Sequence, residues 1–131
     1  MTTSLARSTG DAGALFDLSG TVATNAAWAE DIYFTEAGAP FDISELDWKL
    51  TFRRNGENTS ADFTLSAAAG TLTVAADDNG HNRILRIGVG AGALSSHEGD
   101  FIADLASKDG AGAVLLWAHG IISFRPNPVT F

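Results

Sequence analysis

The stretch Asp47-Trp48-Lys49-Leu50-Thr51-Phe52-Arg53 alternates large apolar side chains with polar ones. Successive side chains of a β-strand point to opposite faces of the sheet. Trp48, Leu50 and Phe52 would therefore share one face, while the polar residues between them would face solvent. The stretch predicts a strand that buries one face in the core of the protein.

The same alternation recurs along most of the chain. Phe63 and Leu65 alternate with polar residues, and so do Leu72 and Val74. Besides the stretch at 47–53, strands are predicted at residues 15–22, 31–35, 62–66, 71–74, 83–89, 101–107 and 114–124. Short strands that follow one another every 8 to 12 residues or so are typical of a β-sandwich.

Turn-forming residues separate several of these strands. Asn55-Gly56, residues 77–80 (Asp-Asp-Asn-Gly) and residues 108–110 (Lys-Asp-Gly) lie between apolar runs. Asn and Asp bind their own backbone and Gly adopts positive φ, so these segments favour hairpin turns. Residues 91–98 offer room for a brief helical turn. The sequence therefore predicts an all-β fold, an antiparallel β-sandwich of about seven to eight strands.

One sandwich domain is expected over residues 15–124. Residues 1–14 are polar with isolated apolar side chains, which is typical of a flexible or partner-bound N-terminal arm. Residues 125–131 contain Pro126 and Pro128 and are expected to form an extended C-terminal tail. The core is predicted from the apolar strand positions, with only one of Phe101 and Ile102 facing inward: Trp48, Leu50, Phe52, Phe63, Leu65, Leu72, Val74, Ile84, Ile87, Phe101, Ile102, Leu105 and Leu115.

The composition excludes several classes of function. The chain has 131 residues, of which 45% are hydrophobic and 18% charged, as in a globular domain. Its formal net charge of -8 makes nucleic acid and anionic membrane surfaces unfavourable partners. No apolar run approaches the roughly 20 residues of a membrane-spanning helix, and the first ten residues do not resemble a secretory signal. We therefore expect no nucleic acid and no membrane as partners.

Two short motifs resemble chemical sites, and each lacks an essential part. Residues 88–93 (GVGAGA) approximate a dinucleotide-binding loop, but the next strand begins too soon for the helix that such a loop needs. Residues 77–80 resemble the start of an EF-hand calcium loop, but Gly88 stands where the bidentate glutamate belongs. The chain has no cysteine, and its three histidines lack the local spacing of metal ligands. We expect no cofactor, no metal and no catalysis.

Six phrases carry a family resemblance: residues 31–35 (DIYFT), 41–44 (FDIS), 47–54 (DWKLTFRR), 70–74 (GTLTV), 98–105 (EGDFIADL) and the closing strand 115–124. Their order and spacing resemble the small immunoglobulin-like domains of tailed bacteriophages, of which the N-terminal domains of phage baseplate upper proteins are the best known. The resemblance covers residues 28–130. The sequence departs from the family at 44–46, where a tighter turn is usual, and at 87–97, which is longer and richer in glycine.

The resemblance implies a non-enzymatic structural protein of the virion, assembled in the host cytoplasm and placed in the tail, baseplate or fibre-attachment region. Its partners would be other virion proteins and copies of itself in a symmetric assembly. Candidate contacts are the apolar residues of the two chain ends, Arg125, and the tryptophans outside the predicted strand 47–53: Leu5, Leu15, Phe16, Trp28, Trp117, Arg125 and Phe131.

Two other functions remain open from the sequence. A capsid decoration protein would use the same fold and the same acidic surface. A carbohydrate-binding module for the host surface would expose Trp28 or Trp117 so that a sugar ring could stack on it. Core packing is the alternative role of both tryptophans, because aromatic side chains dominate core burial.

Overall fold

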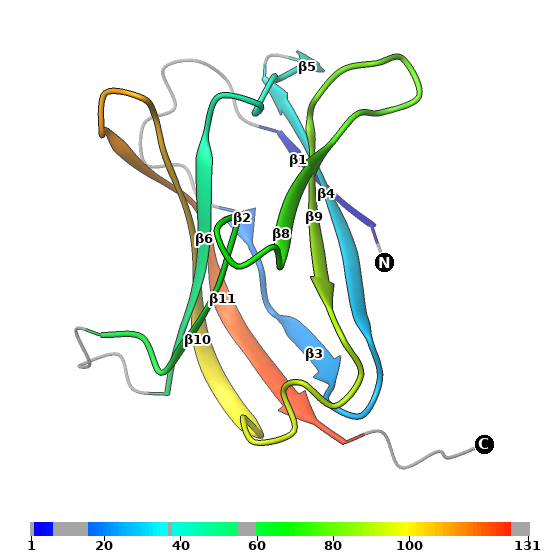
Figure 1. Ribbon diagram of the computed structural model, residues 1–131, viewed down its shortest axis with the longest axis vertical. Coiled ribbons are helices and arrows are strands. Elements are labelled where there is room, and N and C mark those ends of the chain that lie inside the picture. The colour runs from blue at the N-terminus through cyan, green and yellow to red at the C-terminus, as the bar shows by residue number, and fades with distance from the viewer. Residues whose placement is uncertain (1, 7–15, 37, 55–59, 127–131) are drawn as a thin grey trace.

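Two β-sheets pack face to face in the computed structural model (Figure 1), which describes residues 2–6, 16–36, 38–54 and 60–126, the first of these as backbone only. Within these ranges the chain forms strands, turns and loops, and no helix. The strands are β1 (Thr2–Ala6), β2 (Phe16–Asp17), β3 (Gly20–Ala23), β4 (Trp28–Glu36), β5 (Ala39–Pro40), β6 (Asp47–Arg53), β7 (Phe63–Ser66), β8 (Leu72–Ala75), β9 (Ile84–Val89), β10 (Gly99–Lys108) and β11 (Val114–Arg125).

The order of the strands identifies the type of sandwich. One sheet has the order β1-β4-β9-β8, with β5 beside β4. The other has the order β2-β11-β10-β6-β7, with β3 also beside β11. Immunoglobulin domains of the variable type place strands A, B, E and D in one sheet and extend the G-F-C sheet by C′. Here β4, β6, β7, β8, β9, β10 and β11 follow that order as B, C, C′, D, E, F and G, so the predicted immunoglobulin-like β-sandwich is confirmed.

The N-terminal region differs from the prediction. Thr2–Ala6 pairs in parallel with Asp31–Thr35 of β4 and forms an edge of the first sheet, where a flexible or partner-bound arm was expected. The predicted strand 15–22 is divided into β2 and β3, and both pair in parallel with β11. An edge strand needs only backbone pairing along one side. The polar sequence of β1 therefore carries no apolar alternation from which the strand could be predicted.

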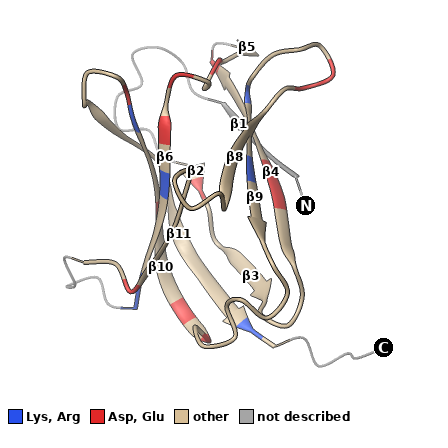
Figure 2. Cartoon of the chain, viewed as in Figure 1, with Lys and Arg blue, Asp and Glu red and all other residues tan. Residues whose placement is uncertain are grey.

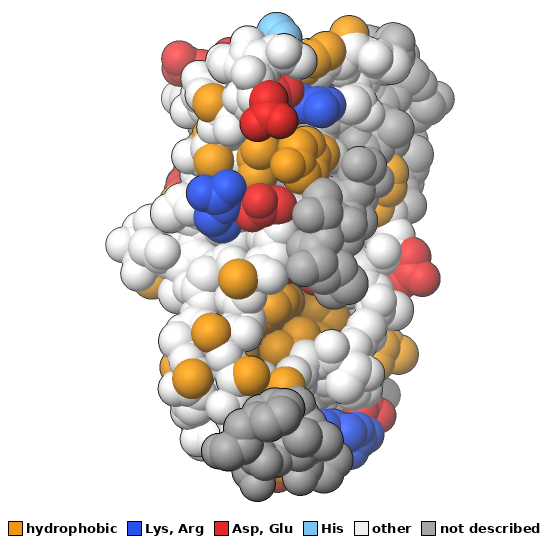
Figure 3. Space-filling view, turned by 90° about the vertical axis from the view of Figure 1, so that its right-hand side faces the viewer, with side chains coloured by type: hydrophobic (Ala, Val, Ile, Leu, Met, Phe, Trp, Pro, Cys, Tyr) orange, Lys and Arg blue, Asp and Glu red, His pale blue; other side chains and the backbone are white. Residues whose placement is uncertain are grey.

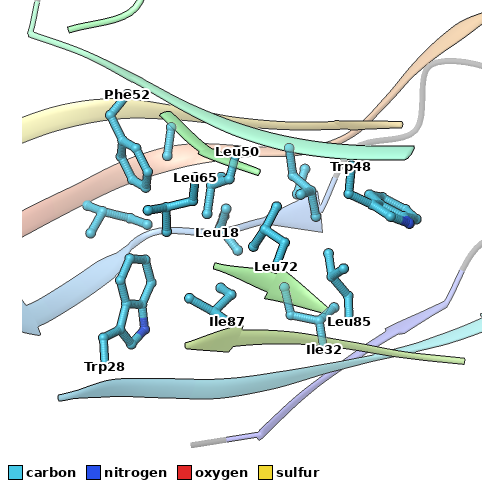
Figure 4. Close-up of a cluster of buried hydrophobic side chains, with 14 of the residues drawn as sticks. Leu18, Trp28, Ile32, Trp48, Leu50, Phe52, Leu65, Leu72, Leu85 and Ile87 are labelled. Atoms are coloured by element: carbon cyan, nitrogen blue, oxygen red, sulfur yellow. The ribbon is translucent and has the colours of Figure 1, made fainter. Parts of the chain in front are cut away.

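The core lies between the two sheets (Figure 4). Trp48 of β6 is fully buried, with its ring 5.0 Å from that of Phe34 on β4. A buried tryptophan at this strand is a hallmark of the immunoglobulin fold, and here aromatic rings fill the space beside it. Most predicted core residues are buried, but Val74 and Leu115 are wrong, since each is 38% exposed. The buried hydrophobic residues larger than alanine that the prediction left out are Leu18, Val22, Trp28, Ile32, Phe34, Ile43, Leu85, Val89, Leu94, Trp117, Ile122 and Phe124.

Charged residues are spread over the strands of both sheets and the loops that connect them (Figure 2). On the first sheet, Arg86 of β9 pairs with Asp31 of β4 at 2.9 Å. Arg83 pairs with Asp77 at 2.7 Å and lies over the ring of Tyr33, 5.3 Å from its centroid. Ion-paired arginines thus cover this face of the sandwich.

Candidate partner-binding surfaces

An apolar surface lies at the end of the sandwich where β10 turns into β11, at the upper left of Figure 1. Val114 is 70% exposed and Leu115 is 38% exposed. They line a shallow pocket together with Phe41 and Leu46, which are half-buried and come from the connection between β4 and β6. We call these four residues the hairpin surface. Contiguous exposed apolar groups of this kind mark sites where proteins bind partners.

The hairpin that carries this surface is fixed by local hydrogen bonds. Asp109 Oδ1 accepts from the backbone N–H groups of Ala111 and Ala113, each at 2.9 Å. The N–H of Asp109 donates to the carbonyl of Ala113 at 3.0 Å, which closes the turn. The predicted turn at residues 108–110 is therefore confirmed. Because the turn is braced by its own backbone, it presents Val114 and Leu115 without help from a partner.

A β-bulge aims Trp117 into the floor of the same pocket. Leu105 faces Ala118 and Ala106 faces Leu116 across the β10–β11 pair, so Trp117 is an extra residue on β11. Strict alternation with His119 would have placed Trp117 on the outer face. Instead it is 4% exposed, its Nε1 donates to Ser107 Oγ at 2.8 Å, and its ring lies 5.4 Å from that of Phe41.

A second apolar feature runs along the outer face of β11. Leu116 is 37% exposed and Ile121 is 55% exposed, and Ile121 lies directly opposite Ile102 of β10. We call Ile102, Leu116 and Ile121 the β11 stripe. Beside it, Asp104 binds both Arg53, at 2.9 Å, and Nδ1 of His119, at 2.6 Å. The stripe therefore borders a polar group whose charge is already balanced.

A hollow between β3 and β4 holds a buried carboxylate. Its lining includes Leu18, Val22, Trp28 and Ile122, and Figure 3 shows hydrophobic side chains inside a hollow on this side of the molecule. Glu30 of β4 reaches into the hollow and is only 6% exposed. Because burial disfavours the charged form, it raises the pKa of Glu30 above the ordinary value of 4.5.

Glu30→Gln is expected to make the fold more stable at neutral pH. A carboxyl whose pKa is raised by folding favours the protonated form, so it costs stability increasingly as the pH rises from the unfolded pKa through the folded pKa. The Tm of the variant should exceed that of the wild type by a few degrees at pH 7, and the difference should shrink below the ordinary glutamate pKa of 4.5. The exposed Glu98→Gln is the control. Thermal unfolding at both pH values measures the effect, and an equal Tm of wild type and variant at pH 7 would contradict it.

The predicted contact residues lie in different places. Trp28 is 7% exposed and Trp117 is 4% exposed, so both are core residues. The prediction that they contact a partner at the surface is therefore wrong. Phe16 is half-buried and packs against the core from β2. Arg125 is the last residue of β11, where the extended C-terminal tail was expected to begin, and it pairs with Asp100 at 3.0 Å. Only the backbone of Leu5 is described, in β1, and Leu15 and Phe131 lie outside the described residues.

The prediction missed the surface residues Phe41, Leu46, Val114, Leu116 and Ile121. The run Val114-Leu115-Leu116 was the available signal. Three consecutive apolar residues in a strand cannot all face one core, because alternate side chains point to opposite faces. The trio therefore required at least one exposed apolar residue at this hairpin.

The described residues were also searched for metal and membrane features. No three His, Cys, Asp or Glu side chains within them are grouped so that they could hold a metal ion. Nor does that part of the chain contain a helix long and apolar enough to cross a membrane.

Comparison with known proteins identifies the fold. No family model matches the sequence, and no curated protein does. Among solved structures, the N-terminal domain of phage TP901-1 ORF48 aligns over 95% of this chain and 99% of its own, with a TM-score of 0.50 and 15% identity. Murine CRIg aligns over 83% of this chain and 92% of its own, with a TM-score of 0.38 and 13% identity. The resemblance to a phage immunoglobulin-like domain, predicted from the sequence, is thus confirmed at the level of the fold.

Proposed function

We propose that this protein is a non-enzymatic structural module of a tailed-phage particle, an adaptor in the tail or baseplate region. The observation that carries the proposal is the fold shared with the N-terminal domain of phage TP901-1 ORF48 over nearly the whole length of both chains. The order of the six sequence phrases supports the same placement. Shared fold alone does not fix function, so the surfaces that the fold presents are considered next.

The hairpin surface supports an assembly role. The exposed side chains of Val114 and Leu115 lie beside the half-buried side chains of Phe41 and Leu46. The hairpin that carries Val114 and Leu115 is held in shape by its own hydrogen bonds. Apolar groups that are rigidly presented lose little conformational entropy on binding. In a symmetric particle the same contact is repeated, so a modest surface would hold each copy firmly. We propose the hairpin surface as the contact to a neighbouring virion protein.

The burial of the tryptophans weakens the carbohydrate-binding alternative. Stacking on a sugar ring needs an exposed aromatic face, and Trp28, Trp48 and Trp117 are at most 7% exposed.

Fractionation of the phage that encodes the protein tests the proposal. Particles would be purified and disrupted, heads and tails separated on a density gradient, and each fraction examined by quantitative mass spectrometry. We expect this chain in the tail fraction at a fixed ratio to other tail proteins. Recovery with heads only would favour the capsid decoration alternative, and absence from purified particles would overturn a structural role.

A further inference from the structure

We propose that the hollow between β3 and β4 binds the end of a lysine side chain from a partner protein. Its apolar walls, which include Leu18, Val22 and Ile122, would hold the last methylene groups, and the Glu30 carboxylate would bind the ammonium group. Glu30 shares the inward-facing side of β4 with Trp28, so it stands at a position that a core strand normally gives to an apolar residue. The inference concerns the purified chain and does not depend on the proposed place in a phage particle.

The described residues supply no positive side chain for the buried Glu30 carboxylate. None of the five ion pairs among them includes Glu30, and the lining of the hollow contains no lysine, arginine or histidine. Burial raises the pKa of Glu30, and the chain's own amino group and the Trp28 indole oppose this to a smaller extent. A buried carboxylate without a paired cation is costly to keep charged, and a cation that entered the hollow would offset this cost.

A second polar group in the hollow also lacks a partner. The Nε1 of Trp28 is buried and forms no hydrogen bond with the described residues. It lies close enough to Glu30 to affect the pKa of the carboxyl. A bound cation would keep that carboxyl charged, and a charged acceptor forms the stronger hydrogen bond. Binding would therefore improve the surroundings of both polar groups at once.

The size of the hollow favours the end of one side chain over a free ligand. Its volume is about 80 Å³. Pockets for cofactors and other small molecules usually measure roughly 300–1,000 Å³, and a cavity of roughly 150 Å³ holds a benzene molecule. The hollow therefore has room for a few heavy atoms, and the rest of the bound molecule would have to stay outside. A side chain that is anchored in a partner protein meets this condition.

The chemistry of the lining favours lysine. Lysine carries a compact ammonium group on a four-carbon stem, whereas arginine carries a planar guanidinium that is best bound by two parallel hydrogen bonds. A narrow apolar hollow with one buried carboxylate matches the stem and the compact charge. Asp17, the other carboxylate of the lining, is exposed, and its Oδ1 accepts from the Ser19 N–H at 2.9 Å. It adds negative charge that would attract a basic group to the hollow.

Titration of the full chain with n-butylammonium chloride, which reproduces the end of a lysine side chain, tests the inference. The methyl NMR signals of Val22 and Ile122 and the indole N–H signal of Trp28 would report binding. We expect saturable shifts with the wild type and a Kd at least about tenfold higher for Glu30→Gln, because the variant removes one partner of a buried charge pair. The exposed Glu98→Gln is the control and should bind like the wild type. Neutral n-butanol should bind at least about tenfold more weakly than the amine.

Two further arms identify the source of the ammonium group. A capped glycine peptide with one central lysine should bind like the free amine, and the same peptide with norleucine should not bind. Binding of the free amine without binding of the lysine peptide would overturn the proposal, because a protein side chain could not then enter the hollow. Amine binding by the N-terminally acetylated chain alone would assign Glu30 to the chain's own amino group and would also overturn it. So would a wild type without saturable shifts, or equal affinities of wild type and Glu30→Gln.

Discussion

Gly120→Ala is expected to destabilise the fold severely. A Cβ at this position would lie 2.5 Å from the backbone nitrogen of Ser19 and 2.9 Å from the carbonyl carbon of Leu18. These backbone atoms belong to the link between β2 and β3. Two hydrogen bonds hold this link against β11: the N–H of Leu18 donates to the carbonyl of His119, and the N–H of Ile121 donates to Ser19 Oγ, both at 3.0 Å. Forced overpacking typically costs about 1–3 kcal/mol, and a backbone clash belongs at or above the upper end.

Gly88→Ala is the matched control for this prediction. Gly88 also lies within a strand, but a Cβ there would meet nothing within 4 Å and its φ is not in the left-handed region. Unfolding in urea should show a large loss for Gly120→Ala and little change for Gly88→Ala. Equal unfolding midpoints for the two variants would mean that the link between β2 and β3 does not lie as close to Gly120 as described.

Trp117→Ala is expected to lower the free energy of unfolding by about 3–5 kcal/mol, the usual cost of removing a buried aromatic side chain. The ring packs against Phe34 at 5.2 Å and Trp48 at 5.9 Å, and its Nε1 binds the buried Ser107. A loss of this size is a large part of the 5–15 kcal/mol that stabilises a typical domain. The variant is expected to unfold at a much lower denaturant concentration than the wild type.

Trp117→Phe separates packing from hydrogen bonding at this position. It keeps an aromatic ring but removes the donor to Ser107 Oγ, so it should cost less than Trp117→Ala, about 1–3 kcal/mol for the buried hydroxyl left without its donor. Chemical denaturation of both variants gives the two costs. If Trp117→Ala proved as stable as the wild type, Trp117 would not be a core residue, and the sugar-stacking role would have to be considered again.

Much of the sandwich could be predicted because its central strands alternate regularly. Trp48, Leu50 and Phe52 are all fully buried, as their spacing indicated. The turn at 77–80 connects β8 and β9 as expected, with Asp77 Oδ1 accepting from the backbone N–H groups of Asn79 and His81. In these segments local sequence and global fold agree, so periodicity and turn chemistry are sufficient.

The remaining errors have physical causes that lie outside local periodicity. Trp117 is turned inward by a bulge, which shifts the alternation by one residue and leaves no mark in the composition of β11. The alternation along β8 places the side chain of Val74 on the inner face of its sheet. However, β8 is an edge strand, and the facing sheet does not cover Val74 there. Whether an inward position is covered depends on what the facing sheet places opposite it.

The candidate partner-binding surfaces were the hardest part to predict. Exposed apolar residues were expected at the two chain ends, whereas the hairpin surface lies where β10 turns into β11 and includes Phe41 from a segment far away in the sequence. The contact between residues 41 and 117 follows from the sandwich topology, which sequence patterns predict only coarsely. Consecutive apolar residues at 114–116 were the one local sign of this surface.

Incorporation of tagged copies into phage particles tests most directly whether this chain docks as a virion component through the hairpin surface. Tagged wild type, Leu115→Asp and Val74→Asp would be supplied during infection, and the tag would be quantified in purified particles. Leu115 and Val74 are equally exposed, at 38%, so the comparison isolates the position of the added charge. We predict that particles contain the wild type and Val74→Asp and exclude Leu115→Asp. Particles that lack tagged wild type, or that take up all three chains equally, would contradict this function.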